Sequence, residues 1–294
     1  MAVRMGEVAE PAAGRHQVLV EVHHASLNYG DLNDAKSGRV PAGGVLGSDA
    51  AGLVVQAAPD GSGPAVGTRV VALTPGAFAQ RVAVDVGAFA EVPPTVDLAK
   101  AAALPVAGVA ALQALRAGGP VRGKRVLVTG ASGGVGRFAV QLAAHGGAEV
   151  IASVGSAARG RDLTEVGADR VVVGLEGIDQ PVHLVLDNVG GPQLVAAWNL
   201  LAPGGSLQSI GWTSGQPAVF PPYSTIGPAK SLTSFLITGD VSSDLATLVR
   251  HVEDGSFTVE IGWRGPWTQV VEAAEALAGR RVNGKAVLDL HPAR

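Results

Sequence analysis

The sequence contains no cysteine, and this absence excludes several kinds of chemistry. Without a thiol the chain forms no disulfide, and it offers neither a thiolate nucleophile nor a thiolate metal ligand. A metal site would therefore need histidines and carboxylates. His23 and His24 are neighbours in a segment of strand character, where consecutive side chains point to opposite faces, and the other histidines are scattered without partners four residues away. We therefore predict no metal site.

Basic runs and long apolar stretches are also missing. The formal net charge of −3 argues against nucleic acid or an acidic membrane surface as the main partner and favours a small molecule. The longest uncharged apolar stretch, 101–112, is broken by Pro105 and Gly108 and is too short to cross a bilayer. Glu7 and Glu10 lie where a signal peptide would be apolar, so we expect a cytoplasmic protein without membrane contact.

Apolar residues, by contrast, are abundant enough for a large core. They make up 47% of 294 residues, and a chain of that length is expected to form two domains. Up to about Val106 the pattern is of short β runs separated by turns, which predicts a β-rich, barrel-like domain. Strands then alternate with helices, which predicts an α/β fold with a doubly wound parallel sheet. The expected strands are 125–129, 149–154, 170–173, 183–186, 206–210 and 232–237, followed by helix 244–253, strand 257–261, helix 268–277 and strand 285–290.

A glycine-rich turn between an expected strand and an expected helix is the most informative motif. Residues 124–136 read Lys-Arg-Val-Leu-Val-Thr-Gly-Ala-Ser-Gly-Gly-Val-Gly. In a dinucleotide-binding turn, a glycine at 133 lets the backbone approach a pyrophosphate, and a glycine at 136 lets the helix pack on the strand. The free N–H groups of the helix start then favour an anion. We expect Ser132, Gly133, Gly134 and Val135 to contact the cofactor.

The residues after the second strand of this domain indicate which dinucleotide binds. NAD is usually met there by a carboxylate, but residues 151–161 contain no acidic side chain. Ser156 and Arg159 occur instead, and a hydroxyl with a guanidinium suits the 2′-phosphate of NADPH. Solvated arginines at a helix start are the alternative, although the helix dipole disfavours a positive charge there. We therefore predict NADPH as the cofactor.

Loops at the carboxyl ends of later strands should border the nicotinamide, because ligands of such sheets lie beyond those ends. Asn188 and Val189 follow the fourth strand, and Gly211 and Trp212 follow the fifth. Asn188 has an equal alternative as the cap of a helix starting near Pro192.

Ordered matches along nearly the whole chain make it similar to the medium-chain dehydrogenase/reductase superfamily, in its zinc-independent branch of quinone oxidoreductases and enoyl reductases. The matching segments are Val18–Val22, Leu27–Asp31, Leu46–Gly52, Gly76–Phe78, Ala101–Val106, Val128–Gly136, Gly167–Asp169, Pro203–Gly205 and Asn283–Leu288. The resemblance implies a GroES-like catalytic domain over 1–106, resumed by 238–294, and a Rossmann NADPH-binding domain over 107–237. It also implies a homodimer formed edge to edge by the Rossmann sheets.

The resemblance further implies roles for single residues. Asn28 and Tyr29 match the segment that faces the nicotinamide and are the expected catalytic residues, while Asn28 can equally cap a short helix with Asp31 at its third position. Lys285 matches a lysine near the cofactor, with a surface lysine at a strand end as the alternative. Leu236 and Trp212 are expected to wall the nicotinamide, although apolar residues near a sheet end are more often core.

Several departures from family patterns restrict the chemistry. Zinc-dependent relatives have a cysteine and a Gly-His-Glu motif where this chain has Asn28 and Gly47-Ser48-Asp49, and thioester enoyl reductases have a tyrosine proton donor where Val40 stands. A threonine that contacts nicotinamide is replaced by Ala110. We therefore expect a zinc-independent, NADPH-dependent reductase of a quinone or a carbonyl-conjugated C=C bond in an apolar small molecule. Two alternatives stay open: a dedicated enoyl reductase of a polyketide-type pathway, and a non-catalytic NADPH-binding or redox-sensing protein.

Overall fold

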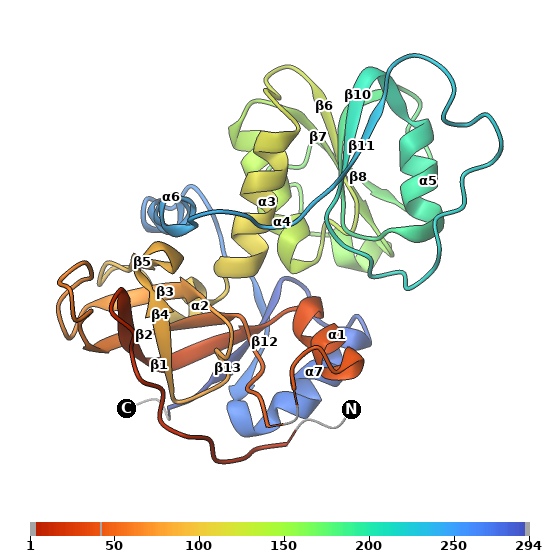
Figure 1. The fold of residues 1–294 in the computed structure, drawn as a ribbon. Helices are drawn as coiled ribbons and strands as arrows, with labels where there is room; N and C mark the ends of the chain where they lie inside the picture. The colour runs from red at the N-terminus through yellow and green to blue at the C-terminus, as the bar shows by residue number, and fades with distance from the viewer. Residues whose placement is uncertain (1–3, 42, 292–294) are drawn as a thin grey trace. The chain divides into compact units, whose positions relative to one another are not determined.

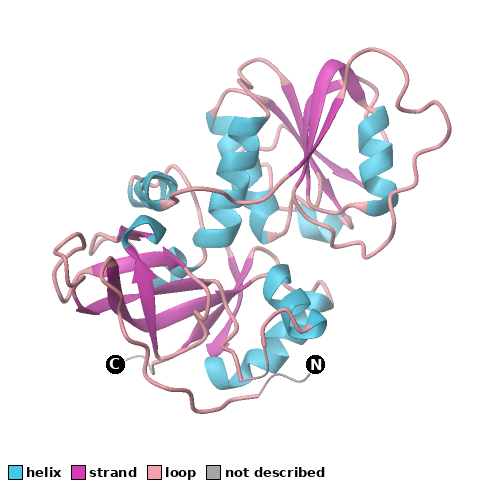
Figure 2. Cartoon of the chain, in the orientation of Figure 1, coloured by secondary structure: helices cyan, strands magenta, loops and turns pink. Residues whose placement is uncertain are grey.

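A computed structural model describes residues 4–41 and 43–291 of the chain. The chain divides into two compact units, one formed by the residues up to Val109 and from Thr238 onward, the other by Ala110–Ile237. Helix α3 (Pro105–Ala117) crosses the boundary between them. The structure therefore has the mixed architecture expected from the sequence, a β-rich unit and a unit with a parallel sheet (Figures 1 and 2).

The first unit is built on a seven-stranded sheet in the order β12-β13-β1-β2-β3-β5, with β4 also paired to β1. Strand β1 is the centre of this sheet and pairs antiparallel with β13, β2 and β4. Its buried side is apolar, and Val18, Val20 and Val22 are fully buried. The strands are β1 (Gln17–Leu27), β2 (Asp49–Gln56), β3 (Arg69–Leu73), β4 (Arg81–Asp85), β5 (Phe89–Glu91), β12 (Ile261–Pro266) and β13 (Lys285–Asp289).

Short helices complete the first unit. Helix α1 (Tyr29–Ser37) follows β1 directly, and Gly38 ends it in a left-handed conformation with a φ of 69°. Helix α7 (Val270–Ala278) contributes Val270, Ala273 and Ala274 to the core of the unit. The remaining helices are α2 (Leu98–Ala102) and α6 (Ser242–Glu253).

The sequence prediction of a strand over 257–261 is wrong, because the strand β12 begins only at Ile261. Phe257 instead packs back on the end of α6, where its ring stacks on His251 at 4.2 Å between ring centroids. Its N–H also donates to the His251 carbonyl. The segment before β12 is therefore a turn in which Phe257 is buried while Thr258 and Glu260 are exposed.

The second unit contains a six-stranded, all-parallel sheet in the order β11-β10-β9-β6-β7-β8. The chain starts in the middle at β6, moves outward to β8, returns to β9 and moves outward the other way. This is the doubly wound Rossmann order, whose switch point lies between β6 and β9. The strands are β6 (Arg125–Val128), β7 (Glu149–Val154), β8 (Arg170–Val173), β9 (Val182–Asp187), β10 (Leu201–Ser209) and β11 (Ser231–Ser234).

Helices cover both faces of the parallel sheet. Helix α4 (Gly134–His145) packs on one face and α5 (Gly191–Asn199) on the other (Figures 1 and 2). The face under α5 is filled by Leu194, Trp198 and Leu207. Across the described residues, no helix has both the length and the apolar character that a membrane span needs.

Candidate active site

The glycine loop of the second unit has the geometry of a cofactor cradle. Strand β6 ends at Val128, and α4 begins at Gly134 with Gly133 as its N-cap. A Cβ on Gly136 would lie 2.3 Å from the Gly130 carbonyl oxygen, so only glycine lets the first turn of the helix pack this closely on the loop. The first N–H groups of α4 have no partner within the helix and are available to an anion.

Arg159 reaches this cradle from the end of β7. Its Nε donates to the Ser132 Oγ at 2.9 Å, and Ser132 is buried while Arg159 is half-buried. Ser156 lies exposed just before the short helical turn Ala157–Gly160 that carries Arg159. The structure thus brings a guanidinium next to the glycine loop at the position where NAD-binding folds have a carboxylate.

The loops after β9 and β10 pack on each other. The Gly211 N–H donates to the Asp187 carbonyl at 3.1 Å, and the Trp212 ring lies over Gly190, where an added Cβ would be 2.5 Å from a ring carbon. Gly190 has a φ of 71°, which an L side chain rarely adopts. Asn188, half-buried Val189, Gly211 and Trp212 are therefore neighbours at the carboxyl end of the sheet.

Asn188 does not cap the following helix, so that alternative is wrong. The N-cap of α5 is Gly190, and the Asn188 side-chain amide instead donates to the Thr129 carbonyl at 2.9 Å. This bond fixes Asn188 against the start of the glycine loop. In this position the buried Oδ1 of Asn188 has no hydrogen-bond partner. A buried acceptor without a partner costs free energy unless a ligand satisfies it.

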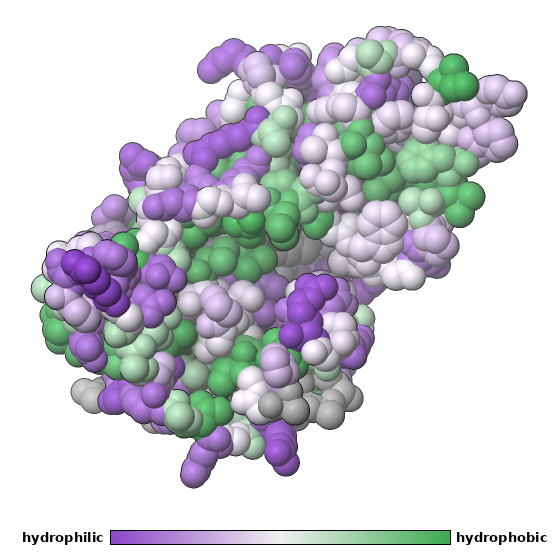
Figure 3. All heavy atoms as spheres, viewed as in Figure 1, coloured by the Kyte–Doolittle hydropathy of each residue, from purple (hydrophilic) through white to green (hydrophobic). Residues whose placement is uncertain are grey.

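Leu236 follows β11 close to the end of β10, because the Phe235 N–H donates to the Ser209 carbonyl at 3.2 Å. It has 79% of its surface exposed, and Trp212 is also 48% exposed. In the space-filling view, hydrophobic atoms lie exposed on the part of the second unit that carries α5 and the segment after β10 (Figure 3).

The first unit holds a buried polar cluster around Asp49, at the start of β2. Asp49 is fully buried and accepts hydrogen bonds from the Ser26 hydroxyl at 2.6 Å, the Asn28 amide at 2.9 Å and the Lys285 ammonium at 3.0 Å. The Val106 N–H donates to its other oxygen at 2.9 Å. Such a buried ion pair persists only because its remaining groups are also hydrogen-bonded.

Lys285 is the cation of this cluster and not a surface lysine, so that alternative is wrong. It is only 3% exposed, because β13 pairs with β1 and places it beside Asn28. Its Nζ also donates to the Asn28 Oδ1 at 2.6 Å. The Asn28 amide therefore bridges the lysine and Asp49.

Asn28 is at the same time the N-cap of α1, as one alternative predicted. The Asp31 carboxylate accepts from the Asn28 N–H at 2.7 Å and from the Ser48 hydroxyl at 3.1 Å. Burial raises the pKa of the Asp31 carboxyl from 3.8 to about 6, and the neighbouring charge of Asp49 acts in the same direction. The Lys285 charge and the two hydrogen bonds lower that pKa but do not offset the burial.

Tyr29, the second expected catalytic residue, is half-buried at the start of α1. Its hydroxyl donates to the Leu277 carbonyl of α7 at 2.9 Å. A phenol has a single proton to donate, so in this structure that proton is already committed to the backbone. A catalytic role for Tyr29 stays a prediction.

A separate pocket of about 470 Å³ lies in the first unit beneath the N-terminal segment. It is lined by residues 4–11 together with Val40, Phe78 and Trp267, among others. None of the site residues predicted from the sequence lines it.

Sequence reasoning missed several residues around the glycine loop and in the Asp49 cluster. Ser26 was not singled out and Asp49 was named only as part of a motif, since Asp49 meets Ser26 and Lys285 only through strand pairing. Arg137 was also missed: it lies buried in the first turn of α4 and its Nη2 donates to the Asp162 carboxylate at 2.9 Å. A charged residue within an apolar helix start was the one available signal.

Comparison with known proteins identifies the family of this chain. Residues 14–94 match the alcohol dehydrogenase GroES-like domain, and residues 134–254 match the zinc-binding dehydrogenase family. A 2-methylene-furan-3-one reductase from Solanum lycopersicum is 31% identical over 306 residues, which cover 97% of this chain and 74% of the relative. The chain belongs to the medium-chain dehydrogenase/reductase superfamily.

Solved structures place this medium-chain dehydrogenase/reductase in the zinc-independent, quinone oxidoreductase-like branch. The quinone oxidoreductase from Coxiella burnetii superposes with a TM-score of 0.85 at 26% identity, covering 97% of this chain and 93% of that one. A mycobacterial protein solved in complex with NADPH superposes with a TM-score of 0.88 at 28% identity, covering 97% and 95%. The chain therefore shares the fold of these proteins along nearly its whole length.

Polyketide synthases are also among the relatives, at 31–36% identity. This medium-chain dehydrogenase/reductase spans only 4–11% of their length.

The residues of the Asp49 cluster do not fit the metal that the name of one matching family implies. Asn28 and Ser48 stand where zinc-dependent members have thiolate and imidazole ligands. The oxygens that face one another, Asn28 Oδ1 and Asp49 Oδ2, both bond the Lys285 ammonium. The cluster holds an amine cation, and no catalytic step is assigned to zinc there.

Proposed function

We propose that this chain is an NADPH-dependent reductase of quinones or of carbonyl-conjugated C=C bonds in apolar small molecules, acting without a metal ion. One observation carries the choice of NADPH as the cofactor. Arg159 bonds Ser132 of the glycine loop, and residues 151–161 around Arg159 contain no carboxylate. The complex of NADPH with a structural relative supports it. The residues also fit the cofactor, because the unpartnered Oδ1 of Asn188 is a buried acceptor for an amide N–H at the carboxyl end of the sheet.

In this proposal NADPH supplies the hydride, and the protein positions it and stabilises the product charge. Ser132, Gly133, Gly134 and Val135 cradle the pyrophosphate, and Ser156 and Arg159 bind the 2′-phosphate. Asn188, Val189, Gly211, Trp212 and Leu236 border the nicotinamide.

Hydride addition to a conjugated acceptor leaves negative charge on its oxygen, which needs hydrogen-bond donors rather than a Lewis acid. Asn28 and Lys285 are the donors that the proposal assigns to this task, because the Tyr29 hydroxyl is bonded to the Leu277 carbonyl. Lys285 has three N–H bonds, of which Asn28 and Asp49 accept two.

A direct test compares two arginines that are close in sequence. We expect Arg159→Ala to weaken NADPH binding about 5- to 150-fold, the equivalent of about 1–3 kcal/mol for a lost bond to a charged group, and to leave NADH binding unchanged. Arg161→Ala is the matched control, because Arg161 is exposed two residues away. Equal losses for NADPH and NADH, or for both variants, would contradict the assignment of the 2′-phosphate to Arg159.

The acceptor is tested by following NADPH oxidation with a panel of quinones, enals and cyclic enones. Turnover of quinones and small enones supports the proposed function. A dedicated enoyl reductase is the second candidate, favoured by the matches to polyketide synthases, and it predicts turnover of α,β-unsaturated thioesters instead. Tight NADPH binding with no acceptor-dependent oxidation would point to the non-catalytic alternative.

We also propose a homodimer formed through the edge of the Rossmann sheet. Strand β11 is an edge strand paired only with β10 among the described residues, and all four of its residues are exposed. An exposed edge offers unpaired backbone groups to a second copy. Mass measurement in solution tests this, and a monomer at micromolar concentration would contradict it.

A further inference from the structure

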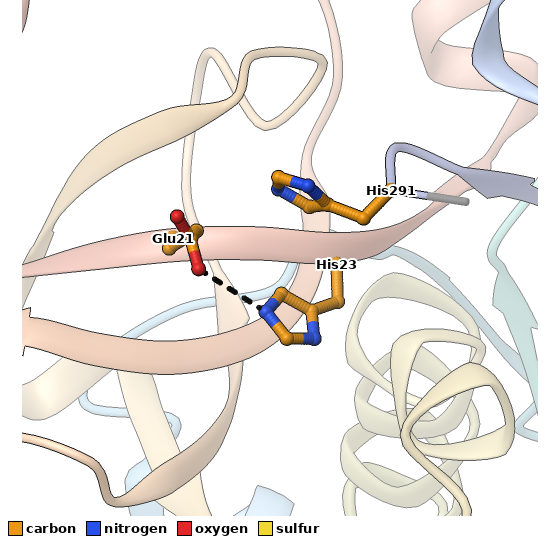
Figure 4. Close-up of side chains that lie close together, drawn as sticks. All are labelled: Glu21, His23 and His291. Carbon is orange, nitrogen blue, oxygen red and sulfur yellow. Dashed lines mark hydrogen bonds and ion pairs between the residues drawn. The ribbon is translucent and has the colours of Figure 1, made fainter. Parts of the chain in front are cut away.

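Three side chains that can ligate a metal converge near the middle of β1, outside the Asp49 cluster. Glu21 and His23 come from β1, and His291 follows β13 (Figure 4). The His23 Nε2 lies 3.4 Å from the Glu21 Oε2, and one ligand atom from each of the three residues lies within 4.8 Å of the other two. All three residues are half-buried.

Strand pairing is what brings these residues together. Strand β13 runs antiparallel to β1, and beyond their paired residues the Leu290 N–H donates to the His23 carbonyl at 2.9 Å. This bond places the next residue, His291, beside His23. The register of β1 against β2 also shifts between Val22 and His24, which marks His23 as a bulge residue. A bulge re-aims the side chain that it carries.

The backbone opposite this bulge is adapted to it. A Cβ on Gly52 would lie 1.9 Å from the Glu21 carbonyl oxygen, so β2 approaches β1 there at a distance that only glycine allows. The neighbouring His24 takes no part in the group, because its Nδ1 bonds the Asp289 carboxylate at 2.8 Å. Two adjacent histidines are thus committed to different partners.

The His291 ring has an unsatisfied nitrogen in this arrangement. Its Nε2 is buried and has no hydrogen-bond partner, although the ring contacts His23 edge to face at 5.1 Å between centroids. A buried imidazole nitrogen without a partner costs free energy, and a metal ion is one of the few ligands that would satisfy it together with a second imidazole and a carboxylate.

We propose that Glu21, His23 and His291 form a binding site for a divalent first-row transition metal, with zinc as the ion that fits best. Two imidazoles with a carboxylate suit zinc and exclude magnesium and calcium, which prefer oxygen ligands alone. Bonds of about 2.0–2.2 Å from zinc to its ligands, in a tetrahedral geometry, require the ligand atoms to lie about 3.5 Å from one another. Side-chain rotation therefore has to shorten any distance between ligand atoms of this group that is longer. A water completes the fourth position.

The proposed site is structural and is separate from the reduction. None of its ligands is among the residues that hydrogen-bond to Asp49. Its effect is to hold Leu290 and His291, which follow β13, against the central strand of the first unit. Arg81 stands across from Glu21 on β4 and would oppose a dication, but its guanidinium bonds the Glu10 carboxylate at 2.7 Å.

Zinc binding to the full chain, freed of any affinity tag, tests the proposal. Competition with a chromophoric chelator should show one zinc per chain, and replacement by cobalt should give the visible absorption of a four-coordinate ion. We expect His23→Gln and His291→Gln each to weaken zinc binding at least tenfold. His24→Gln is the matched control and should stay within about twofold of the wild type, because its ring bonds Asp289.

The same variants define what would overturn the site. Wild-type affinity in the His23→Gln/His291→Gln double variant would do so, and so would an equal loss in His24→Gln. Zinc should also raise the melting temperature of the wild type by a few degrees and leave that of the double variant unchanged. Acceptor-dependent NADPH oxidation should be the same with and without chelator, so this test and that of the proposed function fail independently.

Discussion

The Asp31 carboxyl makes the stability of the first unit depend on pH in a direction opposite to that of most carboxylates. Its pKa is raised in the folded protein from 3.8 to about 6, because it is buried beside Asp49. The folded state therefore binds a proton that the unfolded chain has released, over the range from about pH 4 to pH 6. Stability contributed by this group is gained as the pH falls through 6 and is lost as the pH rises.

The size of the effect follows from the two pKa values. Between pH 7 and pH 4.5, protonation of Asp31 in the folded state should stabilise it by about 2 kcal/mol relative to the unfolded chain. Asp31→Asn removes the titrating group while keeping an oxygen that accepts from the Asn28 N–H. The variant should therefore lack this contribution, and the change in unfolding free energy from pH 7 to pH 4.5 should differ from that of the wild type by about 2 kcal/mol.

Denaturant unfolding followed by tryptophan fluorescence measures the difference. Trp263 and Trp267 pack on the core of the first unit, so a Trp198→Phe/Trp212→Phe background reports that unit alone. Asp34→Asn is the matched control, because Asp34 lies one turn later on the same helix and pairs with exposed Arg39. If the unfolding free energy of Asp31→Asn changed between pH 7 and pH 4.5 by the same amount as that of the wild type, the raised pKa of Asp31 would be contradicted.

Two further substitutions test the loop and the tyrosine. In the same denaturant assay, Gly136→Ala should destabilise the second unit by about 1–3 kcal/mol, because the added Cβ would lie 2.3 Å from the Gly130 carbonyl oxygen. Gly155→Ala is the control and should be neutral or slightly stabilising, because the space around Gly155 is open. Tyr29→Phe should cost about 0.5–1.5 kcal/mol through the lost bond to Leu277 and should leave kcat within about tenfold of the wild type. A fall in kcat of about 10²-fold or more would instead establish the phenol as a proton donor.

The features that sequence analysis predicted well are those built from neighbouring residues. The glycine turn, the strand before it and the helix after it lie within one short stretch, so spacing alone specifies them. The capping of α1 by Asn28 and Asp31 is local in the same way. The alternation of strands and helices that predicted a parallel, doubly wound sheet is also a local pattern.

What sequence analysis missed depends on pairing between distant strands. Lys285 and Asn28 are joined only because β13 lies against β1, and nothing near Lys285 in the sequence marks it as buried. The approach of His291 to His23 has the same cause, which is why a search for histidines at helical spacing predicted no metal site. The Asp49 cluster lies at one end of the paired stretch of β1 and β13, and the proposed metal ligands lie at its other end.

The charges of the Asp49 cluster explain why a lysine is the cation in it. Asp31 and Asp49 are both buried, and two ionised carboxylates without a counter-ion would be strongly unfavourable. The Lys285 ammonium bonds Asp49 directly and offsets the charge of that carboxylate. Asp31 favours its protonated form, which removes the second negative charge. With one ammonium and one ionised carboxylate, the cluster is close to neutral below pH 6. A dication added beside Lys285 would upset that balance, so the proposed zinc site on β1 and the absence of thiolate and imidazole ligands around Asp49 are consistent with each other.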